Sequence, residues 1–270
     1  MSPDTPRAAA PRAASADDVP VPAAAPSAGG PAAPPVESAA AGAPAPAGPA
    51  GGRGITYADA GVDTAAGDRA VELMKDAVAA TMTPAVVGSV GGFAGLVDVS
   101  ALRDYRRPLL AASTDGVGTK VAIARALDVH DTIGQDLVGM VVDDIVVVGA
   151  RPLLMTDYIA CGRVVPERIA NIVRGVATAC AAVGTPLLGG ETAEHPGLMG
   201  PDEYDVAGAA TGVVEADRRL GAERVRPGDV LIALAASGLH SNGYSLVRRV
   251  VERAGWSRSE EHTSELQSRF

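Results

Sequence analysis

The sequence predicts a mixed α/β protein, on three observations. Apolar residues recur every three or four positions in several stretches, which is the spacing of a helix that buries one face. Short apolar runs alternate with these stretches, as strands do in a sheet covered by helices. Glycine and acidic residues follow several of the runs, where strands turn into loops. Hydrophobic residues make up 47% of the 270, a fraction inflated by alanine, and the part of the chain after residue 54 is long enough for a large core.

The N-terminal part of the chain differs from the rest in composition. About 38 of the first 54 residues are Ala, Pro or Gly, which offer little surface to bury. We therefore expect residues 1–54 to be disordered and residues 55–216 to form a first domain. Charged residues at 215–226 indicate a boundary near Asp217, so that residues 217–256 begin a second domain. Residues 257–270 have no apolar stripe and form an anomalous tail.

Charge and cysteine content exclude several classes of protein. The formal net charge is −9, which argues against a surface for nucleic acid or anionic membranes. Small anionic substrates stay open, because a few amides or lysines can hold a phosphate. The most apolar stretch, residues 137–155, carries Asp143 and Asp144 and is excluded as a membrane span. Two cysteines provide no disulfide framework, and without a secretory signal the expected location is cytoplasmic.

Order is expected to begin near Tyr57. A helix starts at Gly67 and ends before Pro84, with Lys75 beside its apolar stripe. The stripe consists of Ala70, Leu73, Met74, Ala77 and Val78. A short strand at 85–90, a glycine-rich loop at 91–95 and a strand at 108–113 follow, and the chain then turns through residues 114–120.

The longest predicted helix spans residues 131–149. Asp144 falls on its apolar side, whereas Asp143 lines up with Asp136 and Gly139. A carboxylate that faces a core requires a cation or hydrogen-bond donors, so Asp144 is a candidate ligand-binding residue. The apolar side consists of Ile133, Leu137, Met140, Val141 and Val148. A strand at 153–159 comes next.

Pro166 opens a further helix, and Cys180 on its regular apolar stripe is assigned to the core. Strands are expected at 185–188, 204–215 and 230–235, the last as a buried strand after a turn at 226–229. The loop of residues 237–243 leads into a final helix at 244–254.

Several junctions between strand and loop combine glycine with an acid and a threonine or lysine. Glycine lets the backbone approach phosphate oxygens, carboxylates bind Mg²⁺, and lysine offsets phosphate charge. This combination is typical of a site for a nucleoside triphosphate with a metal. The loop at 91–95 matches neither a Walker A loop nor a dinucleotide fingerprint, and taken by itself it is better explained as a tight turn.

Seven motifs carry a resemblance to a known family. Residues 144–152, DIVVVGARP, fit the D-x4-G-A-x-P signature of the ATP-dependent superfamily that includes aminoimidazole ribonucleotide synthetase. Six further motifs resemble that synthetase in the order of the family: YADAGVD at 57–63, GGFAGL at 91–96, TDGVGTK at 114–120, HDTIG at 130–134, GGETAE at 189–194, and SGLHSNGYSL at 237–246. The resemblance spans about residues 56–254.

The resemblance implies an ATP-dependent ring closure in purine biosynthesis. ATP activates the formyl oxygen of formylglycinamidine ribonucleotide, and the amidine nitrogen closes the ring of 5-aminoimidazole ribonucleotide with release of ADP and phosphate. The implied architecture is an N-terminal ATP-binding domain whose sheet pairs across a homodimer, followed by a second α/β domain that is truncated here. The implied partners are a ribonucleotide and a second copy, with ATP and Mg²⁺ as cofactors.

The resemblance also assigns roles to individual residues. Lys75, Asp144 and His240 are the implied catalytic residues. A solvent-facing lysine and a structural histidine are the alternative interpretations of Lys75 and His240. Asp115 and Asp144, with Glu191 as a weaker candidate, are the implied Mg²⁺ ligands. The implied ATP-contacting residues are Gly91, Gly92, Gly95, Asp115, Gly116, Gly118, Thr119, Lys120 and Gly149.

Two other functions stay open at the level of the sequence. One is another member of the superfamily, such as thiamine-monophosphate kinase, formylglycinamidine ribonucleotide synthetase or selenide, water dikinase. Missing glutaminase and linker domains argue against the large synthetase, and a missing Cys or selenocysteine near the start argues against the dikinase. The second is a truncated fragment that binds nucleotide or dimerises without turnover.

Overall fold

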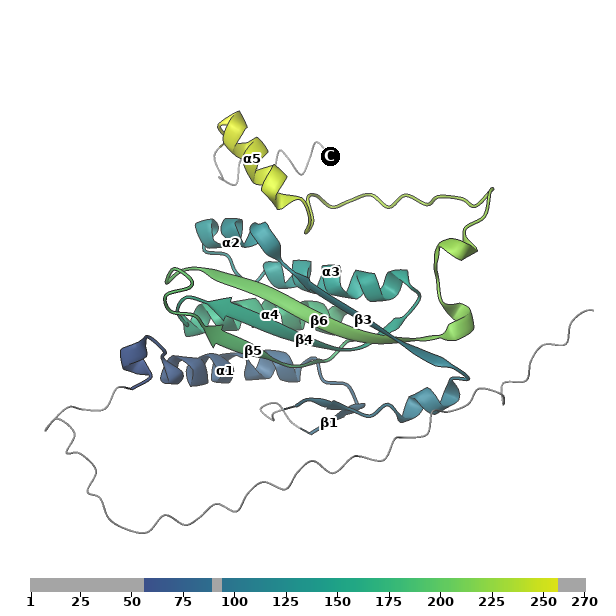
Figure 1. Cartoon of the computed structure of the whole chain (residues 1–270), viewed down its shortest axis with the longest axis horizontal. Coiled ribbons are helices and arrows are strands. Elements are labelled where there is room, and N and C mark those ends of the chain that lie inside the picture. Colours follow the sequence, from purple (N-terminus) through teal and green to yellow (C-terminus); the bar gives the residue numbers. More distant parts are fainter. Residues whose placement is uncertain (1–55, 89–93, 257–270) are drawn as a thin grey trace, which may run out of the picture. The chain divides into compact units, whose positions relative to one another are not determined.

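A computed structural model describes residues 56–88 and 94–256 of the chain. Its main sheet has the strand order β3-β6-β4-β5. The strands are β3 (Pro108–Gly116), β4 (Arg151–Cys161), β5 (Leu187–Glu194) and β6 (Tyr204–Glu215). β4 and β5 run parallel, whereas β6 is antiparallel to both β3 and β4 (Figure 1). The sheet is therefore mixed, and the predicted fold class is confirmed.

Helices cover one face of this sheet. The covering helices are α1 (Thr64–Ala79), α3 (Ile133–Val147) and α4 (Pro166–Ala182). The helices α2 (Val121–Leu127) and α5 (Tyr244–Ala254) lie against the Gly118–Lys120 turn instead of the sheet. α3 packs on β3 and β6, α4 packs beside α3, and α1 packs on α4 (Figure 1). Leu137, Ile172 and Val206 are fully buried between helices and sheet. Burying such side chains contributes roughly 2 kcal/mol each, so this layer carries most of the stability.

Shorter elements complete the described chain. Strands β1 (Val86–Val87) and β2 (Leu96–Val97) form a small antiparallel pair. Single turns of 3₁₀ helix occur at Ala58–Ala60, Ser100–Asp104, Gly118–Lys120, Ala216–Arg218 and Ala222–Arg224. No helix in the described ranges has the length and apolar character needed to cross a membrane.

α3 and α4 approach each other at two glycines. A methyl group on Gly134 of α3 would overlap the backbone of α4 at Gly175 and Val176. A methyl group on Gly175 would overlap the carbonyl oxygen of Asp131, just before α3. The absence of side chains at these two positions therefore allows the two helix backbones to touch. This contact fixes the start of α3, and with it the position of Asp136.

The prediction that Asp144 faces the core is wrong. Asp144 and Asp143 are both exposed. The buried side of α3 is centred on Val141 and Ile145, because these residues face the sheet, and Asp144 lies at the margin of that side. Asp136 is the buried carboxylate of this helix, with 8% of its surface exposed. It is covered by a loop from far along the chain rather than by the sheet.

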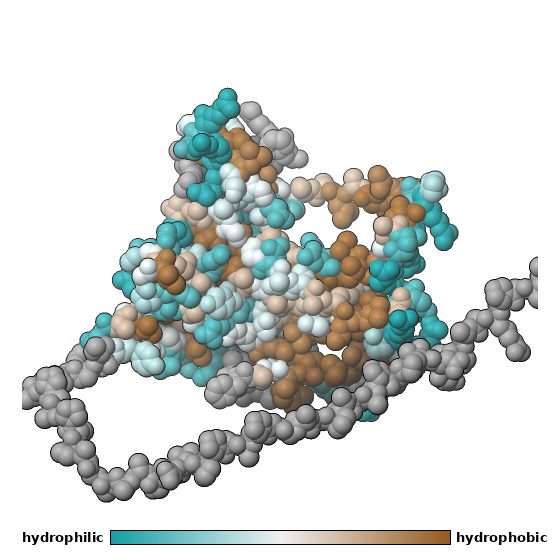
Figure 2. All heavy atoms as spheres, in the orientation of Figure 1, coloured by the Kyte–Doolittle hydropathy of each residue, from teal (hydrophilic) through white to brown (hydrophobic). Residues whose placement is uncertain are grey.

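The prediction of a buried strand at 230–235 is also wrong. These residues form no strand, and Leu231 and Ile232 are 97% and 84% exposed. Figure 2 shows them as a brown band that leads to α5. A strand is stabilised by hydrogen bonds to a neighbouring strand, and none of the described residues supplies one here. The preceding turn is present as predicted, with the Asp229 amide bonded to the Arg226 carbonyl.

The exposure of this segment predicts that it contributes little to stability. Ile232→Ser is expected to shift the melting temperature, measured by circular dichroism, by no more than about 1 °C, because the side chain buries almost nothing. Ile172→Ser is the matched control: that side chain is fully buried on α4, and its replacement should lower the melting temperature by several degrees. A similar loss in both variants would show that residues 230–235 pack against the protein.

Candidate active site

A pocket of about 780 Å³ lies between the end of β3, α3 and the loop of residues 237–243. Four residues predicted from the sequence line it together, although they come from distant parts of the chain. They are Asp115, Lys120, Asp144 and His240. Most of the other lining side chains are polar, so the pocket suits a charged, strongly hydrated ligand rather than an apolar one.

Two carboxylates that line this pocket are each held by one hydrogen bond. Asp115 stands at the end of β3, and its Oδ1 accepts a hydrogen bond of 2.7 Å from the Gly116 amide. Asp144 projects from α3, and its Oδ2 accepts a hydrogen bond of 3.0 Å from the Ser113 hydroxyl. Both side chains keep further lone pairs free and are exposed to solvent. They can therefore accept a cation without a loss of buried hydrogen bonds.

The chain after β3 makes a tight turn. Gly118 has φ of +67° and opens a single 3₁₀ turn that ends at Lys120. A Cβ at Gly118 would meet no other atom, so backbone conformation, rather than space, requires glycine there. The Thr119 hydroxyl lies 3.1 Å from that of Ser245 in the first turn of α5. The predicted phosphate contacts of Gly116, Gly118 and Thr119 thus lie where the turn meets α5.

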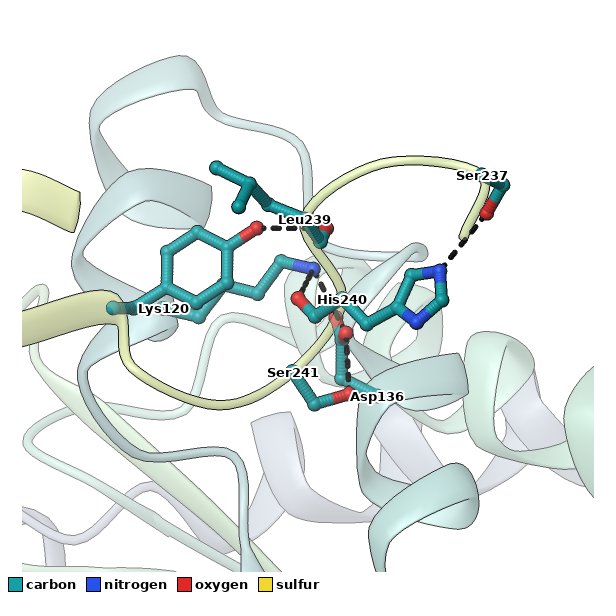
Figure 3. A network of polar contacts seen from close by, with 7 residues as sticks. Lys120, Asp136, Ser237, Leu239, His240 and Ser241 are labelled. Atoms are coloured by element: carbon teal, nitrogen blue, oxygen red, sulfur yellow. Dashed lines mark hydrogen bonds and ion pairs between the residues drawn. The ribbon is translucent and has the colours of Figure 1, made fainter. Parts of the chain in front are cut away.

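Lys120 and Asp136 form an ion pair at the base of the loop of residues 237–243. The distance from Lys120 Nζ to Asp136 Oδ1 is 2.8 Å. Asp136 Oδ1 also accepts a bond of 2.9 Å from the Ser241 hydroxyl, and Nζ donates a bond of 2.9 Å to the His240 carbonyl (Figure 3). The ammonium lies 4.9 Å from the centre of the Tyr244 ring. Three groups from the loop and α5 thus converge on one largely buried charge pair.

The His240 imidazole projects away from the ion pair. Its Nε2 lies 3.0 Å from the Ser237 hydroxyl, within the same loop (Figure 3). The residue is exposed, so the ring can reach a ligand in the pocket. The Tyr244 hydroxyl donates a bond of 3.1 Å to the Leu239 carbonyl, which closes the loop against the start of α5. His240 therefore lies on a short loop that is bonded at both ends.

Other predicted residues lie at a second pocket of about 700 Å³, beside α1 and β5. Gly95 and Glu191 line it, whereas Gly91 and Gly92 lie outside the described residues. Asp157 on β4 also lines this pocket, and its carboxyl group is held close to Gly190. Burial raises the pKa of Asp157 to about 7. The sequence analysis did not single out this carboxyl group.

Lys75 and Gly149 lie at neither pocket. Lys75 is exposed on α1 and pairs with Glu72 at 2.6 Å, a hydrogen bond that raises the pKa of the lysine. Gly149, with φ of +80°, directly follows the C-cap of α3, and its amide bonds to the Val146 carbonyl. This position is typical of a glycine that terminates a helix. Within the described chain, the two residues are not brought to Asp115 and Asp144.

The carboxylates predicted to bind Mg²⁺ meet its requirements in part. Mg²⁺ is usually held by one or two carboxylates together with phosphate oxygens and water, and Asp115 and Asp144 provide that number on one pocket. Glu191 lines the other pocket and does not join them. Across the described residues, no cluster of three or more His, Cys, Asp or Glu side chains could hold a metal ion on its own.

The sequence analysis missed Asp136 as a part of this site. It lies on the side of α3 away from the sheet, where periodicity predicts a solvent-facing acid. One feature of the sequence is consistent with a role in this site. Asp136 lies close to Ile133 and Gly134 at the start of the helix, and this helix follows the turn that carries Lys120. The loop that buries it lies more than 100 residues away in sequence, so local patterns could not predict the contact.

Two family models match the chain. Residues 95–214 match the N-terminal domain of AIR synthase related proteins, and residues 226–269 match the C-terminal domain. The second match starts close to the expected domain boundary and extends across the stretch predicted to be an anomalous tail. The chain therefore belongs to the AIR synthase related proteins.

Similar curated proteins narrow this class. The chain is 58% identical over 195 residues to the phosphoribosylformylglycinamidine cyclo-ligase of Geobacillus kaustophilus, a match that covers 72% of this chain and 56% of the relative. It is 53% identical over 194 residues to the enzyme of the same name from Lachnospira eligens, covering 72% and 57%. The chain thus spans a little over half the length of the curated relatives that it matches.

Solved structures give a weaker likeness. A thiamine-monophosphate kinase from Stenotrophomonas maltophilia is 18% identical, with a TM-score of 0.44 over 55% of this chain and 43% of the kinase. The hydrogenase maturation protein HypE in complex with ATP is 19% identical, with a TM-score of 0.43 over 60% and 44%.

Proposed function

We propose that this chain carries the nucleotide-binding part of a phosphoribosylformylglycinamidine cyclo-ligase. The observation that carries the proposal is the convergence of Asp115, Asp144 and His240 on one polar pocket in a chain 58% identical to such enzymes. The reaction is the ATP-dependent closure of formylglycinamidine ribonucleotide to 5-aminoimidazole ribonucleotide, a step of purine biosynthesis, and its expected location is the cytoplasm.

The chemistry requires a better leaving group than an amide oxygen. Transfer of the γ-phosphoryl group of ATP to the formyl oxygen leaves ADP and an imidate whose carbon is open to attack. The amidine nitrogen forms the new C–N bond, and the C–O bond breaks with release of phosphate. Mg²⁺, when bound, would offset the charge of the phosphates. Asp115 and Asp144 are proposed to hold it, and His240 is proposed to contact the ribonucleotide.

A homodimer is part of the proposal. One face of the sheet packs on α3 and α4, whereas the opposite face is left without a helix among the described elements (Figure 1). Leu110 of β3 and Tyr158 of β4 are 69% and 40% exposed there. A sheet face with exposed apolar residues is stabilised by a second layer, which a partner sheet would supply.

The role of Asp144 can be tested by nucleotide binding. We expect Asp144→Asn to weaken ATP binding at least tenfold by calorimetry in the presence of Mg²⁺, and to change it little without Mg²⁺, because only the metal contact is lost. Glu223→Gln, which changes an exposed carboxylate outside the pocket, should leave both values unchanged. An unchanged affinity of Asp144→Asn with Mg²⁺ would exclude Asp144 as a ligand.

Turnover is measured separately, by release of ADP and phosphate when formylglycinamidine ribonucleotide is added to the full chain with ATP. Ribonucleotide-dependent phosphate release supports the cyclo-ligase. Tight Mg²⁺-dependent ATP binding with no release would identify the chain as a nucleotide-binding part that does not complete the reaction.

A further inference from the structure

We propose that Lys120 and Asp136 are positioning residues: their ion pair fastens the loop of residues 237–243 to α3 and so sets the location of His240. The relevance of that location to catalysis rests on the proposed function, whereas the fastening itself does not. We call the set Lys120, Asp136, Ser241 and Tyr244 the loop clasp.

The burial of the ion pair distinguishes it from the others in the described chain. The side chains of Lys120 and Asp136 are 20% and 8% exposed. Every other ion pair among the described residues has at least one partner whose side chain is 49% exposed or more. Exposed pairs contribute little because water screens them. A pair withdrawn from water interacts strongly, and loss of either partner leaves an uncompensated charge.

The contacts of the pair cross between two parts of the sequence. Lys120 and Asp136 lie in the segment that matches the N-terminal domain model, and Ser241 and Tyr244 lie in the segment that matches the C-terminal one. The Asp136 carboxylate accepts a hydrogen bond from the Ser241 hydroxyl, and the Lys120 ammonium donates one to the His240 carbonyl. The clasp therefore bonds the backbone of His240 itself, not only its neighbours.

Few other contacts hold the loop. The residues before it, 226–237, are exposed, and residues 230–235 pair with no strand of the described chain. The Thr119 to Ser245 contact, at 3.1 Å, supports only the start of α5. Removal of the ion pair should consequently free the loop while the sheet stays intact.

The clasp also changes the role expected of Lys120. Its ammonium donates to Asp136 and to the His240 carbonyl and lies over the Tyr244 ring. A charge compensated in this way is poorly placed to bind phosphate as well. Lys120 therefore acts on a ligand through the loop, not by direct contact with ATP.

Hydrogen exchange of the full chain, followed by mass spectrometry, tests the fastening without any ligand. In Asp136→Asn and Lys120→Met, amides of residues 237–245 should exchange at least tenfold faster, with β4 and β6 unchanged. The increase in the double variant should be smaller than the product of the two single increases, because the ion pair that both residues share is already lost in each single variant. Glu223→Gln, which removes the exposed pair of Arg219 and Glu223, is the matched control.

The rate at which diethyl pyrocarbonate modifies His240 reports on the position of its imidazole. His195 in the same molecule is the internal reference. Loss of the clasp should change the His240 rate at least threefold and leave that of His195 unchanged, whereas general loosening would change both. Loop exchange equal to that of the original protein would overturn the proposal. The proposal would also be overturned if Lys120→Met weakened ATP binding while the exchange rates of the loop amides stayed unchanged. Lys120 would then be a direct ligand of ATP. Neither readout depends on turnover, so failure of the proposed reaction would be seen separately.

Discussion

Replacing Gly175 with alanine is expected to destabilise the protein by about 3 kcal/mol and to lower its melting temperature by roughly 10 °C. The added methyl group would overlap the Asp131 carbonyl oxygen, which belongs to backbone and cannot rotate away. Relief requires α3 and α4 to separate, and separation opens a gap beside Leu137 and Val176, both fully buried. Thermal unfolding followed by circular dichroism measures the loss.

Gly139→Ala is the matched control for this substitution. Gly139 lies in the middle of α3, and a methyl group there would meet no atom within 4 Å. Alanine is the better helix former, so this variant should be as stable as the original protein or up to about 1 kcal/mol more stable. If Gly175→Ala melted at the same temperature as Gly139→Ala, the close contact of α3 and α4 would be disproved.

Stability is expected to fall as the pH rises from about 4 to 7. Burial raises the pKa of Asp157 from 3.8 in the unfolded chain to about 7 in the folded one. The folded state therefore holds the proton more tightly, and the stabilisation is complete below pH 4 and is lost as the pH rises through 7. A shift of this size corresponds to at most about 4 kcal/mol in the free energy of unfolding.

Urea unfolding at a series of pH values measures this dependence. Asp157→Asn cannot titrate, so its stability should vary less over the same range than that of the original protein. Asp104→Asn, which changes an exposed acid on the Ser100–Asp104 turn, should keep the original dependence. A parallel pH profile for Asp157→Asn and the original protein would assign the dependence to other groups.

Sequence patterns correctly predicted elements whose own residues show which faces are buried. The strand at 204–215 was predicted with its exact limits, because small and apolar residues on both faces fit a central strand. The helix that begins at Pro166 was also predicted from its apolar stripe. β5 extends through Glu194, well beyond the predicted end at 188, because β4 supplies hydrogen bonds to a glycine-rich stretch that resembles a loop in sequence.

Sequence patterns could not predict features that depend on contacts between residues far apart in the sequence. Asp136 is buried by Ser241 and not by the sheet, so the helix period alone could not mark it. Residues 230–235 have the composition of a buried strand, but composition does not reveal whether a partner strand is present. A family motif identifies Asp115, and Asp144 follows from both the helix period and a family motif, but their meeting with His240 at one pocket is visible only in the three-dimensional structure.

The segment at 230–235 bears on how the protein behaves in concentrated solution. Its apolar side chains are exposed, and its backbone amides pair with no strand among the described residues. Separate chains can form a shared sheet along such a stretch. The net charge of −9 keeps molecules apart over long distances but is screened at physiological ionic strength. Within the described chain, these six residues therefore form a stretch that favours pairing between separate molecules.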